Sequence, residues 1–313
     1  CQHHIISDGL SIINLFHRLS TRYAGDLPTE PRDFTEYLDS EATYLASKKA
    51  QKDSAYWKEY LQDPPPPIQL YGNERSDASI GLSRSRLQYD ETLTQRLRDL
   101  TQHESFAAVV PAISRIIAAT TAFVAFLSRA CGNSEILLGL PYGNRPRRFA
   151  DTYGLMMEQI FIRAQVEADD TYTSLATRIR HELLNSIRHG RACVSDRGLQ
   201  YATLNMLPQP PSRFAEFPAK TQIGSATTRG TEPSSRTADL RNTIGIQLFD
   251  FENEALSLNM DLHAATFSPS TQKRVCAHFG KVLAAMVEDP DALISATSSA
   301  GWAVPMGGWG AVG

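Results

Sequence analysis

Two adjacent histidines near the start of the chain are followed by an acid four positions after the second. The string reads His3-His4-Ile5-Ile6-Ser7-Asp8-Gly9. Imidazole titrates near neutral pH, so a histidine here can take a proton from an amine, alcohol or thiol and return it. Asp8 stands where a helix is expected to begin, and it can cap that helix or pair with a cation that fixes the loop. Gly9 permits a tight turn and close approach of a substrate to the backbone.

We assign the catalytic role to His4 and supporting roles in the active site to His3, Asp8 and Gly9. A metal site is the alternative, because His4 and Asp8 can share one face of a helix. No third ligand stands at a recognisable spacing in the sequence. The sequence therefore predicts no bound metal.

Elements of alternating type must position these residues. Apolar residues at 10, 13, 15, 16 and 19 predict a helix over 9–23, directly after Asp8. The same reading predicts helices over 33–50, 53–61, 91–102, 107–131, 171–189 and 269–288, and strands over 83–89, 135–140, 156–166, 201–207, 243–250 and 256–262. Residues 208–242 are a long connection rich in Pro, Ser and Thr. Strands that alternate with long helices favour an α/β two-layer sandwich.

The composition narrows the class of protein. The chain has 313 residues, of which 42% are hydrophobic and 21% charged, and a formal net charge of -3. These values are typical of a globular protein, and they argue against nucleic acid as a partner. The most apolar stretch, residues 116–127, is shorter than the about 20 residues that a bilayer needs, so we expect a buried core helix and no membrane association. Cysteines 1, 131, 193 and 276 form no CxxC pair, which favours reduced thiols and a cytoplasmic protein.

The histidine motif resembles the HHxxxDG signature of the condensation domains of nonribosomal peptide synthetases, in the superfamily that includes chloramphenicol acetyltransferase. Further segments resemble the family in the right order, and the resemblance covers roughly residues 1–293. They are YWKEYL at 56–61 with the prolines at 64–67, EILLGLPYGNR at 135–145, YGLMMEQIFIR at 153–163, LSLNMDLH at 256–263 and the helix 269–288.

The resemblance implies a fold of two α/β sandwiches of the chloramphenicol acetyltransferase type, with the histidine motif midway along a tunnel between them. It implies that two carrier protein domains deliver thioesters on 4'-phosphopantetheine arms, and that an acceptor amine attacks the donor carbonyl. The peptidyl or acyl carriers and a neighbouring adenylation domain are then the partners, and this chain binds no cofactor of its own. His4 acts as general base or as a positioning residue.

The resemblance also divides the chain. We expect the end of the first lobe, with the motif, at residues 1–63, an inter-lobe linker at 64–82, the complete second lobe at 83–293 and a disordered tail at 294–313. In the family the motif aspartate pairs with an arginine, which we expect in a part of the first lobe that precedes this sequence.

Two segments depart from the family pattern. Glu158 and Gln159 stand where the family carries Asn-Thr, in what the resemblance implies is the floor of the tunnel. The Glu158 carboxylate is expected to pair with Arg145 or Arg163, to be neutral through a raised pKa, or to turn into solvent. Residues 188–194, RHGRACV, replace a second family motif, HqdlPFe.

Two other functions stay open. One is a stand-alone HHxxxDG acyltransferase that uses coenzyme A or a carrier thioester. The other is a non-catalytic module that docks carriers, against which the intact histidine motif argues. A cyclization domain would carry aspartates in place of both histidines, and an epimerization domain would carry a glutamate directly before a GHGR string, so neither fits this sequence.

Overall fold

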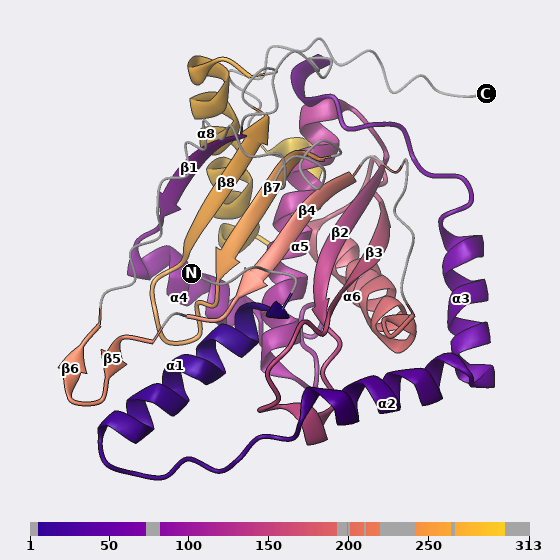
Figure 1. Ribbon diagram of the computed structural model, residues 1–313. Helices are drawn as coiled ribbons and strands as arrows, with labels where there is room; N and C mark the ends of the chain where they lie inside the picture. The colour runs from indigo at the N-terminus through magenta and orange to yellow at the C-terminus, as the bar shows by residue number, and fades with distance from the viewer. Residues whose placement is uncertain are drawn as a thin grey trace.

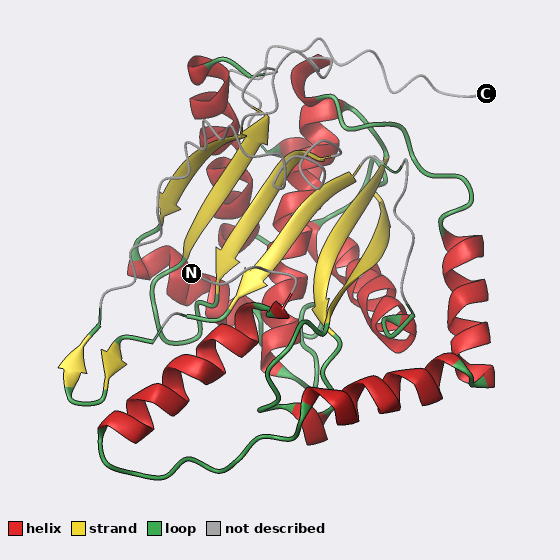
Figure 2. Cartoon of the chain, viewed as in Figure 1, coloured by secondary structure: helices red, strands yellow, loops and turns green. Residues whose placement is uncertain are grey.

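The computed structural model describes residues 6–72, 82–192, 199, 201–209, 211–219, 242–263 and 267–297. A six-stranded mixed sheet carries four helices on one face, and three N-terminal helices run around one end and one edge of the sheet (Figures 1 and 2). One sheet layer against one helix layer is the α/β arrangement that the alternating pattern predicts.

The strand order of the sheet is β1-β8-β7-β4-β2-β3. The pairs β2/β4 and β4/β7 are parallel, and the other neighbouring pairs are antiparallel. The central strands are apolar on the helix-covered face, which fixes their register because a slip by one residue would turn that face to water. The strands span Leu82–Gln88 (β1), Glu135–Gly143 (β2), Met157–Gln165 (β3), Tyr201–Leu207 (β4), Asn242–Phe249 (β7) and Ser257–His263 (β8).

The helix layer is built around α5 (Pro111–Cys131). This helix begins with a proline at its first turn and ends at Gly132, whose φ of 74° is the left-handed conformation that favours glycine. It is long and apolar enough to cross a membrane, yet 78% of its most apolar window is buried inside the protein. It is therefore the predicted core helix. Its neighbours in this layer are α4 (Glu91–Leu100), α6 (Tyr172–His189) and α8 (Pro269–Glu288).

The N-terminal helices are α1 (Gly9–Tyr23), α2 (Phe34–Leu45) and α3 (Lys48–Tyr60). The apolar stripe that predicts α1 is largely uncovered by the described residues: Leu10 is 41% and Leu19 53% exposed. A short hairpin of β5 (Arg213–Phe214) and β6 (Phe217–Pro218) lies against the helix, and the Phe16 and Phe214 rings are 5.4 Å apart.

Three details differ from the sequence prediction. The helix expected over 33–50 ends at Leu45, because Ser47 caps a new helix by accepting a hydrogen bond from the Ala50 N–H. The helix expected from 107 starts at Pro111, since proline has no N–H and suits the first helical turn. The disordered tail expected from 294 is wrong for 294–297, where a 3-10 turn at Ile294–Ala296 buries Ile294. Residues 298–313 lie outside the described residues.

Candidate active site

Asp8 caps the first helix and is almost completely buried. Its Oδ1 atom accepts a hydrogen bond from the Ser11 N–H at 2.9 Å, which satisfies one of the free donors at the start of α1. Its Oδ2 atom accepts from the Met156 N–H at 3.1 Å, so the same carboxylate also holds the segment that leads into β3. The capping role predicted for Asp8 is confirmed.

The cation that pairs with Asp8 is Arg145, in the loop that follows β2. Its Nη2 atom lies 3.0 Å from both carboxylate oxygens, and only 4% of the arginine side chain and 6% of the aspartate side chain are exposed. The Nη1 atom donates to the carbonyl oxygens of Phe149 and Thr152. The expectation that the partner of Asp8 lies in the first lobe is wrong: the β2–β3 loop supplies it from 137 positions away.

Ser11 and Gly154 complete this junction, which we call the clamp (Asp8, Ser11, Arg145, Gly154 and Met156). The Ser11 hydroxyl accepts from the Gly154 N–H at 3.1 Å and lies 2.8 Å from the Gly154 carbonyl oxygen. A Cβ added to Gly154 would lie 2.2 Å from the Phe34 ring. Only glycine therefore fits between the loop and the start of α2.

The electrostatics of the clamp favour an ionised carboxylate. Burial alone would raise the pKa of Asp8, but the hydrogen bonds from Ser11 and Met156 and the charge of Arg145 together hold that pKa below its ordinary value. A carboxylate with these partners is occupied on both oxygens. The arrangement favours helix capping and cation pairing over the alternative of a metal ligand.

His3 and His4 lie outside the described residues, so their predicted roles stay predictions. The clamp holds the chain at Asp8, four residues after His4. Gly9 is the first residue of α1, is exposed, and has no atom within 4 Å of an added Cβ. Its φ is not in the left-handed range, so the start of α1 does not use the conformational freedom of glycine, and the open space agrees with close approach of a ligand.

Glu158 lies at the start of β3 and is half-buried. Neither expected arginine is its partner, since Arg145 pairs with Asp8 and Arg163 lies 2.7 Å from Glu135. Burial and the nearby Glu41 carboxylate raise the pKa of Glu158 above its ordinary value. The expected pairing with either arginine is therefore wrong, and the direction of the pKa shift is the one that burial beside a like charge produces.

Gln159 points to the opposite face of β3 from Glu158. Its Nε2 atom and the Tyr201 ring would lie 2.6 Å from a Cβ added to Gly139, so both side chains cover that glycine. The two candidate floor residues therefore lie on opposite faces of β3: Gln159 belongs to the sheet face away from the helices, and Glu158 lies near Glu41 of α2.

The divergent segment 188–194 contains a second buried polar cluster at its start. Asp53 on α3 has a fully buried side chain, and its Oδ1 atom lies 2.7 Å from His189 Nδ1 and 2.5 Å from Lys49 Nζ. The Tyr44 hydroxyl donates to Oδ2 at 2.9 Å, and the Trp57 indole N–H donates to the His189 carbonyl at 2.9 Å. The segment thus anchors α3 to the end of α6. Residues 193 and 194 lie outside the described residues.

Sequence reasoning missed several residues of this region. Arg145 was considered as a possible partner of Glu158 and as the end of a family-like segment, and Gly154 only as part of another such segment. Ser11 and Glu41 received no role. Ser11, three residues after a capping aspartate, carried a local signal. The pairing of Asp8 with Arg145 carried none, because the two residues meet only in the folded chain.

The model of a family described as Condensation domain matches residues 2–301. Surfactin synthase subunit 1 from Bacillus subtilis (strain 168) is 25% identical over 310 residues, which are 94% of this chain and 8% of that protein. The first condensation domain of the CDA synthetase superposes with a TM-score of 0.76 at 18% identity, over 95% of this chain and 65% of that one.

A starter condensation domain of rhizomide synthetase RzmA, solved as the R148A mutant in complex with C8-CoA, superposes with a TM-score of 0.69 at 18% identity, over 95% of this chain and 67% of that one. The chain thus spans about two thirds of these solved domains and a small part of the synthetase. At these identities, the two structures show a shared fold.

Proposed function

This chain belongs to the condensation-domain family of nonribosomal peptide synthetases, and from that premise we propose that it forms amide bonds. The substrates are a carrier-bound acyl or peptidyl thioester as donor and a carrier-bound aminoacyl thioester as acceptor. The carriers bring their own 4'-phosphopantetheine arms, an adenylation domain loads the acceptor, and the chain itself holds no cofactor. These partners place the protein in the cytoplasm.

In this reaction the acceptor amine attacks the donor carbonyl, a C–N bond forms and the donor C–S bond breaks. The amine must lose a proton, and the donor carrier leaves as a thiol. His4 takes the proton or positions the amine, and His3 supports the loop. Alignment of two bound substrates also lowers the barrier, because the encounter becomes effectively intramolecular.

The observation that carries the proposal is the clamp. The ion pair between Asp8 and Arg145 is almost completely buried, and together with the Met156 N–H it ties the chain four residues after His4 to both ends of the β2–β3 loop. A general base must sit within hydrogen-bond reach of the proton it takes, so a loop that carries one benefits from a fixed attachment. A docking surface without chemistry has no such requirement.

The test uses the full-length protein that carries these residues, with a panel of acyl-carrier donors and aminoacyl-carrier acceptors and mass spectrometry of the amide product. His4→Ala should lower the rate roughly 100-fold or more, as expected for loss of a general base. His17→Ala, an exposed histidine on α1, is the matched control and should retain the parent rate. A His4→Ala protein at the parent rate contradicts the assignment.

A stand-alone acyltransferase that uses coenzyme A or a carrier thioester is the second candidate. The C8-CoA complex of the similar rhizomide domain supports only the use of a coenzyme A donor, because that domain is part of a synthetase. The same assay separates the two candidates when acyl-coenzyme A replaces the donor carrier. Turnover with acyl-coenzyme A but not with the donor carrier supports the second candidate. Binding of carriers without turnover of any donor supports the non-catalytic module.

A further inference from the structure

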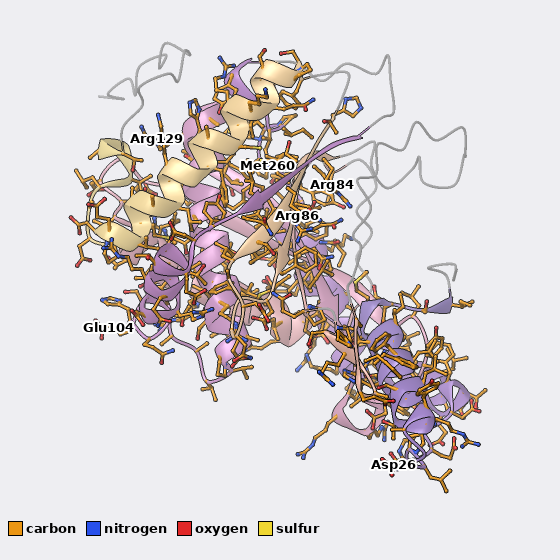
Figure 3. The ribbon with its side chains drawn as sticks, turned by 90° about the vertical axis from the view of Figure 1, so that its left-hand side faces the viewer. Asp26, Arg84, Arg86, Glu104, Arg129 and Met260 are labelled. Atoms are coloured by element: carbon orange, nitrogen blue, oxygen red, sulfur yellow. The ribbon has the colours of Figure 1, made fainter. Side chains whose placement is uncertain are left out.

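The sheet face away from the helices carries polar side chains on β1, β7, β8 and β4. On β1 and β8 the two faces are separated by alternation: Ser83 lies 2.6 Å from Gln272 of α8, and the Met260 and Cys276 sulfurs are 3.8 Å apart. Figure 3 shows Met260 on the α8 side of the sheet, and Arg84 and Arg86 on the opposite side. We call that opposite side the polar face.

Four residues of the polar face lie side by side in register across four neighbouring strands. Asn205 pairs with Gln247, Gln247 with Asn259, and Asn259 with Arg86. We call these four residues the amide row. Neighbouring strands are about 4.8 Å apart, so the row extends over roughly 14 Å. Three carboxamides thus lead to a guanidinium on the edge strand.

Hydrogen-bonding capacity is left over in the amide row. Asn259 is only 2% exposed, and its Nδ2 atom has no hydrogen-bond partner in the described part of the chain. A buried amide N–H that lacks a partner is unfavourable in the free protein and gains fully from a ligand that supplies an acceptor. Asn205 and Gln247 are half-buried on either side.

Arg86 also differs from the arginine beside it. Arg84 forms two 2.6 Å hydrogen bonds with the Asp261 carboxylate, so those two charges offset each other. Arg86 is exposed, and none of the ion pairs among the described residues includes it. The end of the amide row is therefore positively charged, and a planar guanidinium can bind a carboxylate through two parallel hydrogen bonds.

We propose that the amide row binds an acyl chain that contains peptide groups and ends in a carboxylate. The carboxylate pairs with Arg86, and the peptide carbonyls accept from the carboxamides of Asn259, Gln247 and Asn205. This inference rests on the proposed function, because it names the class of acyl substrate that the condensation site uses.

The test measures binding without chemistry, so that its failure is distinct from failure of the proposed function. The probe is N-succinylglycine joined by an amide bond to N-acetylethylenediamine, which mimics an acyl thioester but cannot be turned over; its methyl ester is the neutral counterpart. Calorimetric titration of the full-length protein should give a Kd at least about tenfold lower for the carboxylate, the amount expected for a charged hydrogen bond.

Arg86→Gln should abolish this tenfold preference, whereas Arg96→Gln, an exposed arginine on α4, should preserve it. Asn259→Leu should weaken binding of both probes and leave the unfolding temperature close to that of the parent, because the Nδ2 atom that the change removes has no hydrogen-bond partner in the part of the chain that the structure describes. Equal affinity of the parent for the acid and the ester overturns the proposal.

The phosphate of a carrier arm offers related chemistry, so 4'-phosphopantetheine and pantetheine form a second pair of probes. An Arg86-dependent preference for the phosphorylated compound, with none for the succinyl carboxylate, also overturns the acyl assignment. Selective carboxylate binding by a protein that fails the condensation assay would support the amide row and count against the proposed reaction.

Discussion

Replacing Asp8 by asparagine should destabilise the fold through the clamp. The change keeps the size of the side chain and an oxygen that can cap α1, but it removes the charge that faces Arg145. Loss of one partner from a buried ion pair typically costs about 3–5 kcal/mol, because the other charge stays buried. Arg145 retains the carbonyl oxygens of Phe149, Thr152 and Gly154 as acceptors. We therefore expect the lower end, about 3 kcal/mol.

Urea denaturation at pH 7 measures this loss of unfolding free energy directly, and thermal unfolding should show a decrease of roughly 6 °C at about 2 °C per kcal/mol. The matched control is Asp33→Asn, which changes an exposed helix cap of α2 that accepts from the Thr35 N–H. Asparagine caps helices as well as aspartate does, so the control should unfold close to the parent.

The pH dependence has a definite sign. Because the folded pKa of Asp8 lies below its ordinary value of 3.8, the unfolded chain binds more protons between the two values, and stability rises with pH there. The difference in unfolding free energy between the parent and Asp8→Asn reaches its maximum above about pH 5. It decreases as the pH falls through the pKa of Asp8 in the folded protein. Equal urea midpoints for the parent and Asp8→Asn at pH 7 would contradict a stabilising role of the clamp. An Asp8→Asn protein that is stable but inactive would indicate that Asp8 takes part directly in the reaction.

Two further predictions concern the β2–β3 region. Gly154→Ala should destabilise the protein by about 1–3 kcal/mol in urea denaturation, because the new methyl group meets the Phe34 ring, whereas Gly143→Ala, with open space around its Cβ, should be nearly neutral. Equal effects of the two would contradict this packing. Glu158→Gln should stabilise the protein at pH 7 by up to about 1 kcal/mol and lose the gain below about pH 4.5, because a raised folded pKa means that ionisation opposes folding. In the condensation assay Glu158→Asn should reduce any preference for basic over neutral acceptors, and an unchanged profile removes Glu158 from the site.

Local patterns predicted most of the fold. Helix α8 has the predicted bounds, and α1 begins directly after the predicted cap, because apolar periodicity and capping residues act within a few positions. The break at Ser47 was missed since the helical pattern runs on through residues that also favour a new start. Element ends inside such runs depend on which competing cap the tertiary structure uses.

The candidate site was less predictable than the fold. The residue type and position of Asp8 predicted its role as a helix cap. Its partner Arg145 is 137 residues away, and only the β2–β3 loop brings it close. The state of Glu158 depends on Glu41, which arrives on a different helix. The amide row needed the register of four strands, and register is set by burial of the opposite face rather than by the polar residues themselves.

Helix α1 is attached to the rest of the protein near both of its ends. The helix has 15 residues and is about 22 Å long. Its start is held by the clamp, and near its other end the Ser20 hydroxyl accepts from the Ala215 N–H of the hairpin at 2.6 Å. The hairpin is therefore connected through a rigid helix to Asp8, four residues after His4. If a docked protein displaced β5 and β6 as a rigid unit, α1 would tilt about the clamp.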